Sequence, residues 1–461
     1  MTGRRVSVTE AVFLAAESRE SMMHVGGLLH FTPPADAPPD FLRGLMDELR
    51  EHPPTIQPPW NRKLRHPNWL THPLQGWVED EHFDLGYHVR RSALPSPGDE
   101  RELGILVSRL HSHEVDFHRP LWELYFIEGL SGGRFAMYSK VHHALIDGFT
   151  AMRVMATSFS MDPDERDMPL YFARPRSERG SAGAPVASLA ALLDLAREGM
   201  GGQPKFLRAL LRLGLAAGGR NHDLAVPLQA PHTVFNRRIS RNRRFATQTY
   251  ALDRLKRVAR AGEGTLNDVA LAVCGGALRR YLLDLGDLPD RPLVAMIPVN
   301  IRPADDPGGG NAVGAILASL ATHVADPVDR LRAIVASTRR AKAQLEGMPR
   351  STILQYTATL LAPLSVQLVT GTAGRVRPAF NLVISNVPGP TEPLYFRGAR
   401  LEASFPLSIP FHGYGLNITL SSYAGTLNFG FIGCRMVLPH LQRLAVYAGE
   451  ALEELEAALG T

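Results

Sequence analysis

A change in composition between about Pro175 and Val234 divides this 461-residue chain into two parts. Gly, Ala, Pro, Ser and Arg dominate that stretch, whereas strand-like and helix-like segments alternate on either side of it. Such a stretch is typical of a connection between domains rather than of a hydrophobic core. We therefore predict two α/β (α+β) domains, each a mixed sheet with helices. Their ranges are 1–175 for the N-terminal domain, 176–234 for a partly helical linker and 235–461 for the C-terminal domain.

Several segments outside the linker have the periodicity of a single element. Strand-like residues between turn-forming residues predict strands at 26–31, 293–299 and 380–385, and a hairpin that turns at Ala424-Gly425. Apolar residues at helical spacing predict helices over 40–51, 100–113, 268–282 and 438–459.

Cysteine content and charge indicate the cellular compartment of the protein and the class of partner that it binds. Cys274 and Cys434 are too few for a disulfide framework and lie among apolar residues, which predicts buried thiols in a cytoplasmic protein. Glu10 and Glu17 interrupt what would be the apolar core of a secretory signal. The net charge is +5, but no basic stripe interleaved with aromatic residues is present, so nucleic-acid binding is disfavoured.

The stretch from Ser351 to Gly374 is uncharged and is flanked by Arg350 and Arg375. It contains several polar residues and Pro363, which makes it a poor membrane-spanning helix. It fits either a buried core helix or a helix that lies on a membrane surface. We expect peripheral contact with a membrane or with lipid inclusions such as droplets.

The segment 134–148 carries the residues best suited to catalysis. Strand alternation places His143 on the apolar face and His142 on the opposite face, and Asp147-Gly148 then ends the strand before a helix at 149–158. Imidazole titrates near neutral pH and is matched to removing a proton from an alcohol. A structural histidine, with Asp147 as a helix cap, would explain the same residues.

A metal site is not predicted. His142 and His143 point to opposite sides of a strand, so they would not readily bind one ion. A richer group lies at the end of the helix predicted at 100–113 and just after it, but it lacks a standard metal spacing. Its members are His111, His113, Glu114, Asp116 and His118.

Residues 142–148 read HHALIDG and match the HHxxxDG motif of CoA-dependent acyltransferases. That superfamily includes chloramphenicol acetyltransferase and the condensation domains of peptide synthetases. Pro120-Leu121-Trp122-Glu123 resembles the PLW element of bacterial wax ester synthase/diacylglycerol acyltransferases. Four further segments are similar to that family: 23–27 (MHVGG), 266–270 (LNDVA), 298–303 (PVNIRP) and 385–390 (SNVPGP). The resemblance runs from about Val8 to Leu455, apart from the linker.

The resemblance implies two chloramphenicol-acetyltransferase-like domains with a channel at their interface. Acyl-CoA would enter from one side, and a fatty alcohol or diacylglycerol from the other. His143 would act as general base in a direct transfer without an acyl-enzyme. Acyl-CoA is then a substrate, and no cofactor is expected.

The resemblance also assigns roles to other residues. Asn267 would donate to the developing oxyanion or orient the acceptor, although it could instead cap the helix that it precedes. His142, Asp147, Gly148 and Arg302 would shape the site, with Asp147 paired to Arg302. Substrate contacts are predicted for Pro120, Leu121, Trp122, Asn300 and Asn386, and turn formation is an alternative for the loop after Asn386.

The arginines between Arg237 and Arg244 could bind CoA phosphates or anionic lipid, or they could form a solvated surface without a binding role. Two other functions stay open at this stage. One is a different HHxxxDG enzyme, such as a condensation domain or a glycolipid acyltransferase. The other is a lipid-binding protein that uses the same channel without catalysis.

Overall fold

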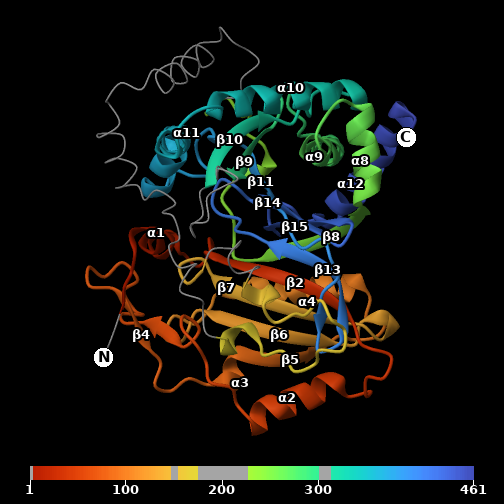
Figure 1. The fold of residues 1–461 in the computed structure, drawn as a ribbon. Helices are drawn as coiled ribbons and strands as arrows, with labels where there is room; N and C mark the ends of the chain where they lie inside the picture. Colours follow the sequence, from red (N-terminus) through yellow and green to blue (C-terminus); the bar gives the residue numbers. More distant parts are fainter. Residues whose placement is uncertain (1–3, 147–153, 175–226, 301–312) are drawn as a thin grey trace.

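The structure is a computed structural model that describes residues 4–146, 154–174, 227–300 and 313–461 (Figure 1). Two six-stranded sheets lie at its centre, one in each half of the molecule, and a three-stranded sheet lies beside the N-terminal half. Residues 176–226 of the linker predicted at 176–234 lie outside the described residues. Residues 149–153 of the helix predicted at 149–158 do so as well, and residues 154–156 are helical.

The N-terminal sheet has the strand order β12-β13-β2-β7-β6-β5. Its strands are β2 (His24–Thr32), β5 (Val89–Ala93), β6 (Trp122–Glu128), β7 (Phe135–His142), β12 (Tyr395–Phe396) and β13 (Ala399–Leu407). The helices of this half are α1 (Val8–Ala16), α2 (Phe41–Glu51), α3 (Leu85–His88) and α4 (Glu100–His111), with short 3-10 turns at Ser131–Gly133 and Tyr171–Ala173. The small sheet contains β1 (Arg4–Arg5), β3 (Arg62–Leu64) and β4 (Gly76–Glu79).

The C-terminal sheet has the order β10-β9-β11-β14-β15-β8. Its strands are β8 (Arg243–Ala251), β9 (Val294–Asn300), β10 (Val313–Ser319), β11 (Leu382–Val387), β14 (Leu416–Tyr423) and β15 (Thr426–Cys434). Its helices are α8 (Leu252–Ala261), α9 (Leu266–Asp284), α10 (Pro327–Leu345), α11 (Arg350–Val369) and α12 (Gln442–Leu459), and a 3-10 turn spans Val234–Asn236. The strands and helices predicted from periodicity in both halves are confirmed, with small shifts at their ends.

Local sequence explains several of these boundaries. Ala424 and Gly425 both have positive φ, of 40° and 82°, which is the backbone that a two-residue hairpin turn between β14 and β15 requires. Pro327 occupies the first turn of α10, and the side chain of Asp326 accepts from two backbone amides there. Most residues of α9 are buried around its circumference, which explains its nearly continuous apolar sequence.

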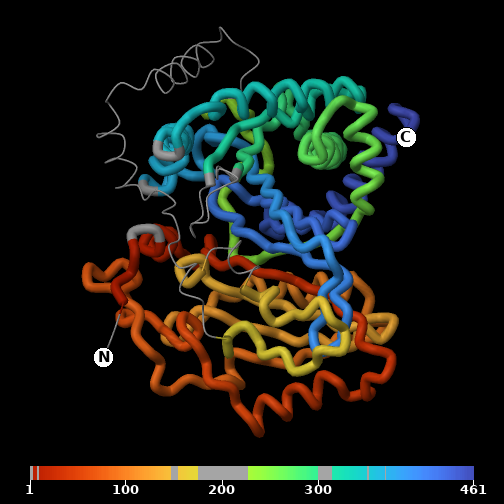
Figure 2. Tube along the Cα trace, in the orientation of Figure 1, coloured from red at the N-terminus to blue at the C-terminus, as the bar shows by residue number. Residues whose placement is uncertain are grey.

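Strand β13 connects the two halves. It follows β11 in the chain, yet it pairs antiparallel with β2 of the N-terminal sheet, from Arg400 opposite Thr32 to Leu407 opposite Gly26. Figure 2 shows this blue segment among the red and orange strands. Residues 395–407 therefore belong to the N-terminal sheet, although they lie within the range predicted for the C-terminal domain.

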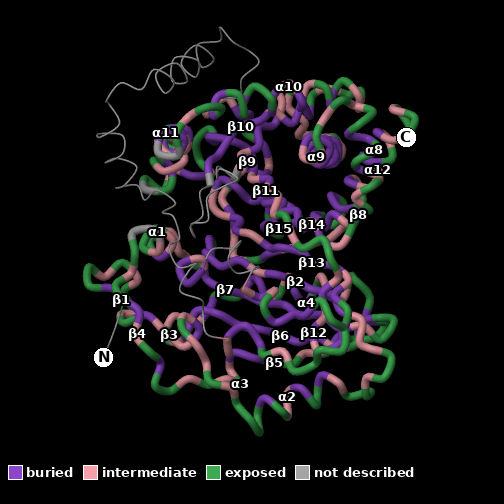
Figure 3. Tube along the Cα trace, viewed as in Figure 1, coloured by how far each residue is buried: buried purple, intermediate pink, exposed green. Residues whose placement is uncertain are grey.

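The two sheets approach each other closely where β13 meets β15. A Cβ atom at Gly430 of β15 would collide with the carbonyl oxygen of Pro406 of β13, so only glycine fits there. Figure 3 shows that the strands on both sides of this junction are mostly buried. Cys274 and Cys434 are buried free thiols, as predicted. Within the described ranges, no helix has the length and apolar character needed to cross a membrane.

Candidate active site at the end of strand β7

His143 directly follows β7, a central strand of the N-terminal sheet, and is held from two sides. Its backbone amide donates to the carbonyl oxygen of Met23, at 2.8 Å. Its ring stacks on Phe13 of α1, with ring centroids 3.9 Å apart and an interplanar angle of 17°. A capping box between Ser7 and Glu10 fixes the start of α1. The sheet and α1 together set the position of the imidazole.

His142 is fully buried and has a different environment from His143. The backbone amide of Ala144 donates to its Nδ1 at 3.0 Å, which leaves Nε2 as the protonated ring nitrogen. That Nε2 lies 3.3 Å from Oε2 of Glu17 and donates to it. The same carboxylate oxygen accepts from the amide of Met23 at 2.5 Å. Glu17 therefore joins the segment before β2 to the turn that carries His143.

We expect Glu17→Ala to lower kcat by about ten- to one-hundred-fold, because loss of this carboxylate releases both segments that position His143. KM for the acyl donor should change little, since the Glu17 side chain is 5% exposed and contacts His142. Steady-state kinetics of purified Glu17→Ala, with Glu20→Ala as the matched control on an exposed side chain, would measure the effect. Wild-type kcat in a folded Glu17→Ala variant would show that Glu17 does not position the site.

Asn267 lies in the first turn of α9 and is partly buried. The alternative that it caps this helix is wrong, because the N-cap is Thr265. The amide of Asp268 donates to the Thr265 hydroxyl at 3.3 Å, and the Thr265 amide donates to the Asp268 carboxylate at 2.9 Å. Threonine followed three residues later by an acidic side chain is a capping signal that was present in the sequence. The catalytic role of Asn267 stays a prediction.

Pro120, Leu121 and Trp122 are buried in the hydrophobic core of the N-terminal half. The indole nitrogen of Trp122 donates to the carbonyl oxygen of Trp60 at 2.8 Å, and its rings stack on His88, with centroids 4.6 Å apart. These contacts account for the PLW element by core packing. A substrate would have to displace neighbouring side chains to touch Trp122, and the predicted substrate contact is untested.

The remaining predicted site residues are described only in part. Asp147, Gly148 and Arg302 lie outside the described residues, so the Asp147–Arg302 pair stays a prediction. Asn300 is the last residue of β9, where its backbone is opposite Val313. Asn386 is in β11, opposite Leu420 of β14, and is partly buried.

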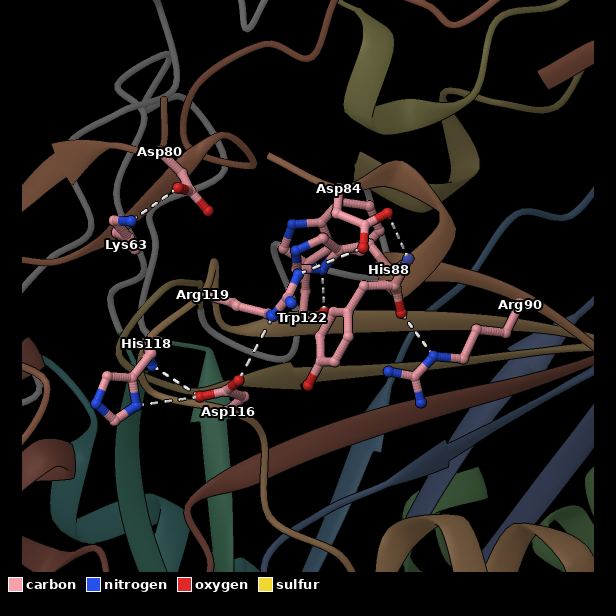
Figure 4. A network of polar contacts seen from close by, with 10 residues as sticks. Lys63, Asp80, Asp84, His88, Arg90, Asp116, His118, Arg119 and Trp122 are labelled. Atoms are coloured by element: carbon pink, nitrogen blue, oxygen red, sulfur yellow. Dashed lines mark hydrogen bonds and ion pairs between the residues drawn. The ribbon is translucent and has the colours of Figure 1, made fainter. Parts of the chain in front are cut away.

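The histidines and acidic residues considered above as a possible metal site form hydrogen bonds and ion pairs with other side chains. Nδ1 of buried His111 lies 2.8 Å from the Tyr138 hydroxyl. His118 lies 3.3 Å from Asp116, which also pairs with Arg119 at 3.5 Å (Figure 4). No group of histidine, cysteine or acidic residues in the described parts of the chain is arranged to hold a metal ion.

The arginine run does not form one solvated surface. Arg243 is buried, and its guanidinium donates to the carbonyl oxygen of Glu20 at 2.6 Å. Burial lowers the pKa of Arg243 to about 10. Arg241 contacts His113 at 3.2 Å, and Arg238 contacts His412 at 3.0 Å. Arg243 and Arg241 therefore join the two halves of the molecule, whereas Arg238 contacts His412 of the C-terminal part of the chain.

A cavity of about 280 Å³ lies where the two sheets meet. Leu29 of β2, Leu401 of β13 and Phe159 give it apolar walls, and residues 387–390 of the loop after β11 line it as well. Ser404 of β13 also lines it and is buried, and its hydroxyl has no hydrogen-bond partner among the described residues. The cavity thus combines mainly apolar walls with a few hydroxyl-bearing side chains, Ser404, Ser421, Ser422 and Tyr423. Such a composition suits an aliphatic chain that carries a polar end.

Two family models match the chain and leave only a short gap between them. The wax ester synthase/diacylglycerol acyltransferase catalytic domain matches residues 6–270, and the WS/DGAT C-terminal domain matches residues 309–456. The chain belongs to the wax ester synthase/diacylglycerol acyltransferase family. This confirms the resemblance drawn from residues 120–123 and 142–148.

Similar proteins agree with this family over the whole chain. A putative diacylglycerol O-acyltransferase of Mycobacterium tuberculosis is 52% identical and covers 100% of this chain and 98% of its own. The O-acyltransferase WSD of Acinetobacter baylyi is 40% identical, with 97% of this chain and 96% of its own covered. The solved wax ester synthase/diacylglycerol acyltransferase of Marinobacter aquaeolei VT8 has a TM-score of 0.81 at 39% identity and covers 99% of this chain and 100% of its own. This wax ester synthase/diacylglycerol acyltransferase family member is therefore an O-acyltransferase enzyme.

The first condensation domain of the calcium-dependent antibiotic synthetase shares the fold, with a TM-score of 0.59 over 99% of this chain and 96% of its own. At 15% identity, this likeness concerns the fold alone. It agrees with the predicted arrangement of two chloramphenicol-acetyltransferase-like domains, whereas the family models assign the chain to the wax ester synthase/diacylglycerol acyltransferases rather than to condensation domains.

Proposed function

We propose that this family member transfers a long-chain fatty acyl group from acyl-CoA to a fatty alcohol or to diacylglycerol, with His143 as general base. The observation that carries the proposal is the fixed position of His143 at the end of β7, between Met23 and Phe13. A base held by a sheet and a helix needs little reorganisation before it takes a proton. The apolar cavity between the two sheets supports an aliphatic substrate.

The proposed reaction is a direct transfer. The imidazole of His143 takes the proton of the acceptor hydroxyl as that oxygen attacks the thioester carbonyl carbon. The tetrahedral intermediate then expels the CoA thiolate, which recovers the proton from His143. Asn267 is the candidate donor to the oxyanion, by the family resemblance. No metal and no cofactor takes part in this scheme.

Contact with a membrane or with lipid inclusions is part of the same proposal. Fatty alcohols and diacylglycerol partition into lipid, so the enzyme must meet them at a lipid surface. A peripheral association fits the mildly basic chain, whose net charge is +5.

The test is an acceptor panel with purified protein and palmitoyl-CoA. We expect release of free CoA thiol in step with ester formation when hexadecanol or dioleoylglycerol is supplied, and little release without an acceptor. Equal thiol release with and without acceptor would indicate a thioesterase. Lipid binding without thiol release would indicate the non-catalytic alternative, and either result would overturn the proposal.

A further inference from the structure

The C-terminal end of α11 and the loop after it expose apolar side chains to solvent. Val366 is 58% exposed, Leu368 is 40% exposed and Val376 is 43% exposed. Arg375 and Arg377 flank Val376 and are exposed as well. We call residues 366–377, together with the adjoining Leu228 and Arg237, the α11 surface.

Hydrogen bonds and close packing make these segments one surface. The Gln367 side chain donates to the carbonyl oxygen of Arg377 at 2.8 Å, and Nε of Arg377 donates to the carbonyl oxygen of Ala230 at 3.3 Å. Gly374, with φ of 79°, packs so closely on the backbone of Arg237 and Arg238 that a Cβ atom would not fit. The apolar and basic side chains are therefore presented together by a fixed scaffold.

The charge of this region is one-sided. Residues 347–391 contain no Asp or Glu, and their three charged side chains are Arg350, Arg375 and Arg377. The whole chain carries 45 acidic residues in 461, so a stretch of that length would hold about four on average. Arg237 adds a further exposed cation. Among the described residues, Glu20 is an acidic side chain near this edge, where it interacts electrostatically with His412.

The α11 surface is linked to His143 by a short series of contacts. Arg238 lies 3.0 Å from His412, the neighbour of Phe411. Phe411 packs in one hydrophobic cluster with Met23 and Phe13, and Phe13 stacks on His143. Figure 1 shows α11 and α1 along the same edge of the molecule. A partner bound to the α11 surface would lie next to the site that uses lipid substrates.

We propose that the α11 surface docks the enzyme on an anionic lipid membrane. Valine and leucine side chains among arginines suit a lipid surface, where the apolar groups enter the headgroup region and the arginines meet lipid phosphates. Soluble CoA would use the arginines but would leave the apolar side chains in water. A symmetric contact between two copies of the chain would oppose arginine to arginine. This inference rests on the proposed lipid acyl transfer, because docking would bring the acceptor to the site.

The experiment measures partition of the purified full chain onto vesicles of phosphatidylcholine with and without phosphatidylglycerol. One variant combines Arg237→Gln, Arg375→Gln and Arg377→Gln, and a second combines Val366→Ser, Leu368→Ser and Val376→Ser. The matched controls carry the same changes on exposed residues elsewhere, Arg50, Arg101 and Arg332 for charge and Ile105, Leu283 and Val446 for apolar area. Melting temperatures confirm that each variant is folded.

We expect the wild type to bind vesicles that contain phosphatidylglycerol, and less strongly as salt increases. The arginine variant should lose roughly one hundred-fold in partition, and the apolar variant roughly ten-fold. Both controls should bind as the wild type does. Failure of the wild type to bind, or equal binding by the folded α11 variants, would overturn the inference.

A second readout separates this inference from the proposed function. Ester formation from a soluble acyl-CoA and a short-chain soluble alcohol should be unchanged in both α11 variants, whereas ester formation from diacylglycerol in vesicles should fall with partition. A raised KM for acyl-CoA in the arginine variant would mean that the surface binds CoA rather than membrane. Absence of any ester from wild-type protein would refute the acyl transfer itself, and vesicle binding would still report on docking.

Discussion

His143→Ala is expected to lower the rate of ester formation by about 10²–10⁴, which is the usual contribution of a general base. The variant should fold normally, because the ring of His143 is partly exposed and the backbone hydrogen bond to Met23 does not depend on it. KM for acyl-CoA should stay close to the wild-type value, since the imidazole acts on the acceptor hydroxyl. Steady-state kinetics and thermal melting of the purified variant measure both parts.

The matched control for that variant is His118→Ala. His118 is an exposed histidine that pairs with Asp116 and Asn68. It should keep wild-type turnover, which excludes a general effect of removing a histidine. His142→Ala should differ from both variants by lowering the stability of the fold, because it leaves the Ala144 amide and the Glu17 carboxylate without their buried partner. Normal turnover in folded His143→Ala would contradict its role as the base.

Glu123→Ala should lower the free energy of unfolding by about 3–5 kcal/mol, the largest stability effect that we expect from one substitution. Glu123 of β6 and Lys140 of β7 are opposite each other, with Oε2 and Nζ 2.9 Å apart, and their side chains are 6% and 1% exposed. Removal of the carboxylate leaves a buried ammonium group without its counter-ion. Desolvation already lowers the pKa of Lys140, and Glu123 opposes that shift.

Urea unfolding of Glu123→Ala, Glu123→Gln and Glu128→Ala tests this expectation. Glu123→Gln keeps a hydrogen-bond acceptor for Lys140 and for the Tyr125 hydroxyl, so it should fall between the wild type and Glu123→Ala. Glu128 lies at the end of the same strand with a half-exposed side chain, and its pair with Arg91 spans 3.6 Å. Its removal should cost no more than about 1 kcal/mol. Equal unfolding midpoints for all three variants would show that the buried pair does not stabilise the fold.

The features that the sequence predicted are those with a local signal. Ala424-Gly425 adopts the turn backbone that its position between two strand-like runs indicated, and the long apolar run from Asp268 became the buried helix α9. His142 and His143 were distinguished by strand alternation and by the motif. The structure also gives the two histidines different environments, but their burial is the reverse of what alternation predicted. His142 is fully buried, whereas His143 lies beyond the end of β7 and is only partly buried.

The features that the sequence did not predict depend on contacts between distant residues. Strand β13 has the pattern of any buried strand, and nothing local indicates that it pairs with β2 rather than with the strands around it in the chain. Glu17 lies 125 residues from His142, and at the sequence level it served only as evidence against a secretory signal. For Trp122, the substrate contact implied by the family resemblance stays a prediction. Its burial and its hydrogen bond to Trp60, which the motif did not indicate, show that it packs in the core.

The central claim is that His143 promotes direct transfer from the thioester to the alcohol. Rapid-quench analysis of a single turnover with acyl-labelled palmitoyl-CoA tests it most directly. We predict that the label passes from CoA to ester when hexadecanol is present, and that no label is bound covalently to protein when the alcohol is absent. His143→Ala should form ester in the same experiment at least about one hundred-fold more slowly. Stoichiometric label on the wild-type protein, or wild-type ester formation by the His143→Ala variant, would contradict the claim.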